Sequence, residues 1–351
     1  MTTTLARSKP RPASNGVKRI NLALQGGGAH GAYTWGVLDR LLEDGRLEVD
    51  GISGTSAGAM NAAVLAFGHG EGGNDGARAA LERFWRAISK ASEMSPLKAS
   101  PWDRLLSSWG VEMTPSNIAF DFLSRLFSPY QFNPFNFNPL RDVLESIIDF
   151  DRLRQHADIK LYISATNVKT GRVRVFDCAE ISADVLLASA CLPFLFQAVE
   201  IDGAPYWDGG YMGNPSLFPL IYNCESKDVM IVQVNPLTCD QVPASARGIL
   251  DRVNEISFNS TLMREMRAVS FVTDLLDQGQ LAEAKYKRMF VHWIDAEEEM
   301  KGLGVSSKLN ADWDFLSHLK DIGRRTADTW LAQNYDSIGR ASSVDIRAKF
   351  L

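Results

Sequence analysis

The strongest chemical signal in this sequence is the pentapeptide at residues 54–58, which reads Gly-Thr-Ser-Ala-Gly. A short run before it suits the end of a strand, and a run of small apolar residues after it suits a buried helix. On a sharp turn from strand to helix a serine exposes its hydroxyl, and the glycines Gly54 and Gly58 let the backbone bend without a Cβ clash. The pattern indicates Ser56 as a catalytic nucleophile. The alternative is a tight turn whose serine only caps a helix.

A second glycine-rich stretch, residues 26–31 (GGGAHG), precedes this turn by one predicted strand and helix. Its spacing fits a dinucleotide fingerprint, but no acidic residue closes a second strand, and the Lys-Ser/Thr of a P-loop is missing. Consecutive backbone N–H groups at a helix N-terminus bind anions, including the oxyanion of an acyl-transfer intermediate. Because the loop lies just before the Ser56 turn, the sequence favours this third interpretation.

A serine hydroxyl needs a base to remove its proton, and the usual base is histidine. Four histidines lie in segments that indicate structural roles: His69, His156, His292 and His318. Asp208 instead ends a predicted β segment, and Gly209 and Gly210 leave room around its carboxylate. A free aspartate with a pKa of ~3.9 is a weak base, but burial raises this pKa. The sequence thus predicts a dyad of Ser56 and Asp208, against the alternative that Asp208 caps a turn.

The elements that must position these residues follow from hydrophobic periodicity. Strands are expected over 18–25, 49–53, 158–168, 172–177, 228–235 and 288–295, and residues 198–207 are expected to form a strand, a turn and a second strand. Helices are expected over 32–42, 57–68, 77–90, 139–150, 183–190, 217–222 and 313–335, with one or two long helices over 243–285 and a flexible loop over 69–76. The alternation of strands and helices, without a repeat or linker, predicts a single domain of α/β class over residues 18–351.

Three segments stand apart from this pattern. Residues 1–17 are polar and suit a disordered tail. Residues 93–139 combine prolines with many aromatic side chains, which predicts a cap or lid over an apolar cleft, with packing into the main core as the alternative. Residues 240–351 are expected to form a helical C-terminal extension that packs on the domain.

Composition excludes several classes of protein. Hydrophobic residues at 45% and charged residues at 23% are typical of a globular protein, and the net charge of -5 gives no nucleic-acid footprint. No apolar run approaches the roughly 18 residues of a membrane span, and the N-terminus lacks the apolar region of a signal peptide. The four cysteines show no zinc spacing, so we expect reduced thiols and a cytoplasmic location.

The glycine loop, the Gly-x-Ser-x-Gly turn and Asp208-Gly209-Gly210 occur in an order that resembles the patatin-like phospholipase family, in particular its bacterial members. The resemblance covers roughly residues 18–235 and implies a three-layer α/β/α sandwich with a mainly parallel sheet. It also implies lipid acyl hydrolase activity without a metal or other cofactor. Ser56 would be the nucleophile and Asp208 the base. The oxyanion donors would be the loop N–H groups, drawn from Gly26, Gly27, Gly28 and Ala29, with Gly31 completing the motif.

The chain departs from this family at His30, where many members carry Arg or Lys. We expect a group that titrates near neutrality in place of a permanent cation. Ser307 and Lys308 suggest a second catalytic pair, although a loop with a helix cap is the favoured interpretation.

Two other functions stay open besides hydrolysis of a phospholipid, lysophospholipid or glyceride. One is an acyltransferase that uses the same acyl-enzyme. The other is a non-catalytic lipid-binding protein, for which the aromatic segment would supply an interaction surface. Each function is compatible with a peripheral contact between the protein and a membrane.

Overall fold

A computed structural model of the chain describes residues 16–93, 128–283, 285–300, 303 and 305–350. Within these residues one mixed sheet has the order β5-β6-β3-β2-β1-β7-β8, and β4 also pairs with β3. The strands are β1 (Lys18–Leu24), β2 (Leu47–Gly54), β3 (Lys160–Asn167), β4 (Val173–Asp177), β5 (Val199–Ile201), β6 (Ala204–Asp208), β7 (Asp228–Val232) and β8 (Phe290–Ile294). Neighbours among β3, β2, β1, β7 and β8 are parallel, whereas β4, β5 and β6 form antiparallel pairs.

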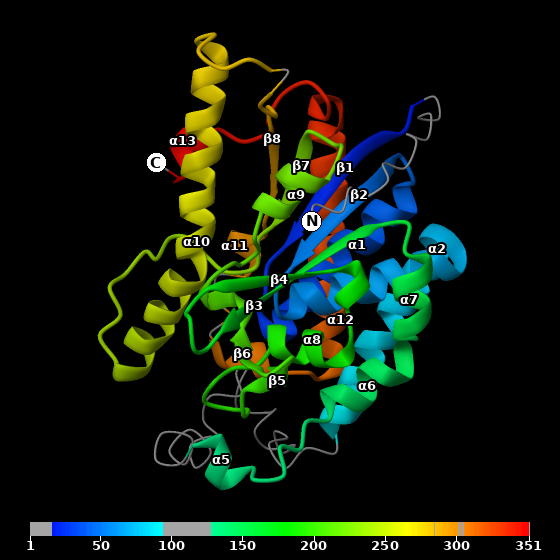
Figure 1. Cartoon of the computed structure of the whole chain (residues 1–351), viewed down its shortest axis with the longest axis vertical. Coiled ribbons are helices and arrows are strands. Elements are labelled where there is room, and N and C mark those ends of the chain that lie inside the picture. Colours follow the sequence, from blue (N-terminus) through cyan, green and yellow to red (C-terminus); the bar gives the residue numbers. More distant parts are fainter. Residues whose placement is uncertain (1–15, 94–127, 284, 301–302, 304, 351) are drawn as a thin grey trace.

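Helices cover both faces of this sheet, and Figure 1 shows α10 on one side and α1 and α2 on the other. The first layer contains α1 (Gly31–Asp44), α2 (Ala57–Glu93) and α12 (Trp313–Asn334). The second contains α9 (Phe218–Asn223), α10 (Ala246–Asp277) and α13 (Ile346–Phe350). Further helices are α5 (Pro129–Phe132), α6 (Leu140–Ile147), α7 (Phe150–His156), α8 (Ala183–Ser189) and α11 (Glu297–Met300), with short 3₁₀ turns η1 (Gly28–His30), η2 (Cys178–Glu180), η3 (Gly209–Tyr211), η4 (Val305–Leu309) and η5 (Tyr335–Ser337). The predicted three-layer α/β/α sandwich with a mainly parallel sheet is confirmed.

The sheet separates two hydrophobic cores. Ile20, Leu22 and Leu24 of β1 face the core formed with α1, α2 and α12. Ala23 points the other way, into the core formed with α9, α10 and α13. Successive side chains of a strand point to opposite faces, so the alternation seen in the sequence places each residue in its layer.

Several predicted boundaries differ from the structure, among them that of the helix expected over 243–285, which is Ala246–Asp277. The loop expected over residues 69–76 is helical within α2, and the helical dihedrals are broken only at Gly72 and Gly73. Glycine composition predicts a loop, but the packing of Ala77, Leu81 and Phe84 in the core keeps the second half of α2 in place. The helix expected over 139–150 ends at Ile147, and Asp149 caps a new helix by accepting a hydrogen bond from the Arg152 N–H.

Some predicted segments lie outside the described residues. Most of the tail at 1–17 and most of the aromatic segment at 93–139 belong to this group. The described end of the aromatic segment contains α5 and the exposed side chains of Tyr130, Phe135 and Phe137. The four cysteines are free thiols. No helix in the described ranges has the length and hydropathy that a membrane span requires.

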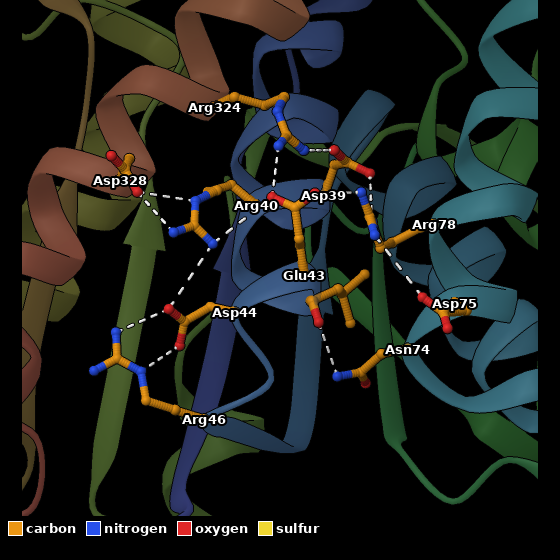
Figure 2. Close-up of polar contacts among 11 residues, drawn as sticks. Asp39, Arg40, Glu43, Asp44, Arg46, Asn74, Asp75, Arg78, Arg324 and Asp328 are labelled. Atoms are coloured by element: carbon orange, nitrogen blue, oxygen red, sulfur yellow. Dashed lines mark hydrogen bonds and ion pairs between the residues drawn. The ribbon is translucent and has the colours of Figure 1, made fainter.

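An ion-pair network ties α1 to α2 and α12 (Figure 2). Asp39 of α1 is 5% exposed and accepts hydrogen bonds from both Arg78 and Arg324. The same two guanidinium groups also bind Glu43, at 2.8 and 2.6 Å. Arg78 lies on α2 and Arg324 lies on α12. Because both bind the buried Asp39 of α1, this carboxylate links the three helices of the first layer.

We expect Asp39→Ala to lower the free energy of unfolding by about 2 kcal/mol, because two half-buried arginines lose their most buried partner. Urea denaturation measures this change. Glu43→Ala is the matched control: its side chain is 38% exposed, and the loss should stay below about 1 kcal/mol. Equal losses in the two variants would contradict the role assigned to Asp39.

Candidate active site

Strands β2 and β6 meet end to end along one edge of β3. Gly54 of β2 pairs with Ile163, and Asp208 of β6 pairs with Ala165, only two residues further along. Strand β4 pairs with the same β3 residues and therefore occupies the opposite edge. Because β2 is parallel to β3 and β6 is antiparallel, their carboxyl ends point toward each other. This arrangement brings Ser56, just after β2, next to Asp208.

Ser56 lies in the turn between β2 and α2, with a φ of 54°. Positive φ is uncommon for a residue with a side chain and is concentrated at functional sites. The turn is held by its backbone: the Ser56 N–H donates to the Ser189 hydroxyl at 2.9 Å, and that hydroxyl donates to the Ser164 carbonyl at 2.7 Å. Such support keeps the Ser56 hydroxyl at the start of α2, as the sequence pattern predicts.

Asp208 is buried, with 2% of its surface exposed. One carboxylate oxygen accepts the Gly210 N–H at 2.7 Å, and the Thr166 hydroxyl donates to the Asp208 carbonyl at 2.8 Å. Burial raises the pKa of this carboxyl to about 7, against the opposing effects of hydrogen bonds from Gly210 and from the Ser56 side chain. Its pKa is therefore higher than that of a free aspartate, and the Ser56 side chain lies close enough to Asp208 to influence it.

The glycine loop lies against the Ser56 turn. A Cβ on Gly26 would stand 2.7 Å from the Ser56 Cβ, so only glycine permits this approach. The Gly26 N–H donates to Asn214 Oδ1 at 2.7 Å and is not free to bind an oxyanion. Within the described part of the chain, the N–H groups of Gly27 and Gly28 have no hydrogen-bond acceptor. Of the predicted oxyanion donors, the Gly26 N–H is therefore excluded.

Three amides fix the loop in this position, and sequence reasoning missed all of them. Gln25 Oε1 accepts the N–H groups of Val234 and Asn235, at 2.9 and 3.0 Å. Asn235 Nδ2 donates to the Gly26 carbonyl at 2.7 Å. Asn214, which accepts the Gly26 N–H, completes the set. The sequence showed these residues only as amides in or next to loops, where amides are also common for ordinary turns.

The C-terminal turn η4 packs directly on the glycine loop. A Cβ on Gly28 would stand 2.4 Å from the Lys308 carbonyl oxygen. Lys308 Nζ donates to Asn235 Oδ1 at 2.7 Å, and the Ser307 hydroxyl bonds His30 Nε2 at 2.7 Å. Ser307 and Lys308 each have a partner in or below the loop, which supports a positioning role for them.

His30 does not behave as expected from the sequence. Burial, followed by the charge of Lys308, lowers its pKa to about 3, so it stays neutral at neutral pH. The prediction that His30 titrates near neutrality is wrong, because α12 and η4 remove its ring from water. Lys308 brings its amino group close to the loop, and burial lowers the pKa of this group.

The other glycines of the three sequence motifs also permit close packing. Gly31, Gly54 and Gly58 allow close contacts between β1, α1 and α2. Gly209 matters most, because a Cβ there would stand 2.1 Å from the Ser164 carbonyl and push Asp208 away from β3. Gly210 supplies the N–H that Asp208 accepts.

The buried pair of His292 and Asp228 lies away from Ser56. His292 Nε2 is 2.9 Å from Asp228 Oδ1, at the amino end of β7, whereas Ser56 lies at the carboxyl end of the sheet. Over the described residues, no group of three or more His, Cys, Asp or Glu side chains is arranged to hold a metal ion.

Comparison with known proteins shows which family model and which solved structures this chain is similar to. Residues 22–221 match the family described as patatin-like phospholipase. Among solved structures, VipD from Legionella pneumophila is 18% identical with a TM-score of 0.38, over 87% of this chain and 67% of VipD. Full-length ExoU from Pseudomonas aeruginosa, in complex with SpcU, is 15% identical with a TM-score of 0.31, over 89% of this chain and 53% of that chain. The chain thus spans about half of ExoU. No curated protein gives a significant match.

Proposed function

This chain belongs to the patatin-like phospholipase family, and on that premise we propose that it is a serine acyl hydrolase that cleaves lipid esters with Ser56 and Asp208. Family membership gives the enzyme class and a lipid as substrate. The observation that carries the finer assignment is the buried Asp208, with its pKa near 7 and its interaction with the Ser56 side chain.

The reaction follows from the positions of these groups. Asp208 accepts the hydroxyl proton of Ser56 while the Ser56 oxygen attacks the ester carbonyl carbon. The carbonyl oxygen becomes an oxyanion, and the N–H groups of Gly27 and Gly28 bind it, with Ala29 as a further candidate. The proton on Asp208 passes to the departing alcohol. Water then enters and gives a proton to Asp208 while its oxygen attacks the acyl carbon. The bond between this carbon and the Ser56 oxygen breaks, Asp208 returns the proton to the Ser56 oxygen, and the fatty acid is released.

We propose that residues 18–351 work as one catalytic unit. Strand β8 extends the sheet beside β7, α12 packs on α1, and η4 buttresses the glycine loop. The extension over 240–351 therefore contributes to the site, and its removal would expose the loop that the oxyanion needs. The assignment of residues 93–139 as a cap remains a proposal about a segment that lies largely outside the described residues.

The pH dependence of the reaction follows from Asp208. Only the ionised carboxylate can accept a proton, and burial raises its pKa to about 7. We expect kcat/KM for a neutral ester to increase about tenfold per pH unit below about pH 7 and to level off above it. Release of fatty acid from a non-ionisable substrate measures this profile. A rate that is constant from about pH 5 to pH 9 would contradict the assignment of Asp208 as the base.

Glu265 provides the control for this experiment. It lies on α10, its pKa is also raised to about 7 by burial, and it accepts the N–H groups of Leu217 and Phe218. Glu265→Gln keeps an acceptor for these N–H groups but removes the titration. The pH profile should be retained in this variant, and its loss would assign the titration to Glu265 instead.

A panel of esters tests the proposal as a whole. Wild type should release fatty acid from at least one phospholipid, lysophospholipid or glyceride, and Ser56→Ala should not. An alcohol acceptor added to the same reactions separates hydrolysis from acyl transfer, because a transferase would form the new ester in preference to free acid. If no ester is turned over, the catalytic proposal fails and a lipid-binding role is favoured.

A further inference from the structure

The N-terminal half of α10 carries an aliphatic surface that no described part of the chain covers. Ile249, Val253 and Ile256 are separated by four and three residues, so they lie on one face of the helix, and Leu250 flanks them. Val253 and Ile256 are each 56% exposed. The opposite face carries Leu262 and Met266, which are buried in the second core. We call the exposed residues Ile249, Leu250, Val253 and Ile256 the α10 stripe.

The same helix contacts the proposed catalytic site just after the stripe. Phe258 packs edge to face on Tyr211 of η3, and a Cβ on Gly210 would stand 3.0 Å from the Phe258 ring. Asn259 Oδ1 accepts a hydrogen bond from Gln25, below the glycine loop. The stripe therefore ends within one helical turn of Phe258 and Asn259, which contact the neighbours of Asp208 and of the glycine loop. Figure 1 shows the N-terminal half of α10 at the end of the molecule that also contains β6 and α5.

Two arginines follow the stripe on the same face. Arg264 and Arg267 lie eight and eleven residues after Ile256, which corresponds to about two and three helical turns. Both side chains are exposed, and within the described residues neither has an acidic partner. The chain as a whole is acidic, with a net charge of -5, so the positive charge of these two arginines is confined to this part of the surface. An aliphatic face continued by two cations complements a bilayer, whose interior is apolar and whose surface is anionic.

We propose that the α10 stripe, with Arg264 and Arg267, is the surface that docks this enzyme on an anionic lipid membrane beside the catalytic site. This inference rests on the proposed function, because a lipid hydrolase must take its substrate from an aggregate. Docking would bring the surroundings of Asp208 and of the glycine loop, which Phe258 and Asn259 contact, close to the lipid surface.

Sedimentation with vesicles tests the docking surface. Val253→Asp should bind vesicles of phosphatidylcholine with phosphatidylglycerol at least about tenfold more weakly than wild type, because a charge replaces an apolar contact. The control is Asn254→Asp, which adds the same charge at an exposed position about 100° around the helix. It should bind as wild type does. Arg264→Gln with Arg267→Gln should lower the binding to these vesicles toward that of phosphatidylcholine alone.

Enzyme assays separate docking from chemistry. Val253→Asp should keep its activity on a water-soluble butyrate ester and lose at least about tenfold on the vesicle substrate. The docking inference is overturned if wild type does not bind vesicles, or if Val253→Asp binds them equally well. A wild-type dimer that Val253→Asp converts to monomer, with vesicle binding unchanged, would assign the stripe to a contact between copies. Failure of the proposed function gives a different result, because wild type would then bind vesicles without hydrolysing any ester.

Discussion

Ser56→Ala is expected to reduce ester hydrolysis by at least about 10⁴-fold, the largest effect of any single substitution in this chain. The variant keeps the glycine loop and its N–H groups but lacks the oxygen that forms the acyl-enzyme. Initial rates of fatty-acid release with wild type and variant side by side measure the loss. Activity within about tenfold of wild type would rule out Ser56 as the nucleophile.

The variant must be shown to be folded before the loss is interpreted. Alanine keeps the Cβ that contacts Gly26, and the backbone N–H of residue 56 still donates to Ser189. We therefore expect the free energy of unfolding of Ser56→Ala to stay within about 1 kcal/mol of wild type. Urea denaturation provides this control.

Asp208→Asn is expected to reduce kcat by about 10³- to 10⁴-fold, because the amide is similar in shape but cannot accept the Ser56 proton. The amide carbonyl oxygen of this variant can still accept the Gly210 N–H, so the local structure should be retained. Loss of activity without loss of the fold would distinguish a base from a structural turn cap. Activity similar to wild type would leave the sequence-based alternative, in which Asp208 only caps η3.

The same substitution should increase stability at alkaline pH. Because the pKa of Asp208 is raised to about 7 in the folded protein, the native state holds this proton more tightly than the unfolded state does. Wild type therefore loses stability as the pH rises from about 4 to about 7, and Asp208→Asn does not. The variant should be more stable than wild type by up to about 4 kcal/mol near pH 8 and by little near pH 4. A lower stability of the variant at both pH values would contradict this account of the buried carboxyl.

The parts of the site that were predicted from sequence are those with local signals. Alternating Ile20, Leu22 and Leu24 predicted β1, and the small residues that follow Ser56 predicted the start of α2. Asp208 was predicted from its place at the end of a β segment, and the structure places it beside Ser56. Each of these signals lies within a few residues of the feature that it predicts.

The contacts that the sequence could not predict join distant segments. Asn214 accepts the Gly26 N–H across 188 positions of the chain, and Lys308 binds Asn235 across 73. Only the folded sheet brings these residues together, so the sequence could not show that the Gly26 N–H already has an acceptor. His30 was misjudged for the same reason, because the ring contact with Phe315 and the bond to Ser307 depend on the C-terminal extension.

The central claim is that Ser56 is made nucleophilic by the buried carboxylate of Asp208. Its most direct test is the rate of covalent labelling by a fluorophosphonate, followed by intact-protein mass spectrometry and peptide mapping. We predict one adduct on Ser56 in wild type, slow formation in Asp208→Asn, and no adduct in Ser56→Ala. Equal labelling of all three proteins, or an adduct that maps to another residue, would contradict the account.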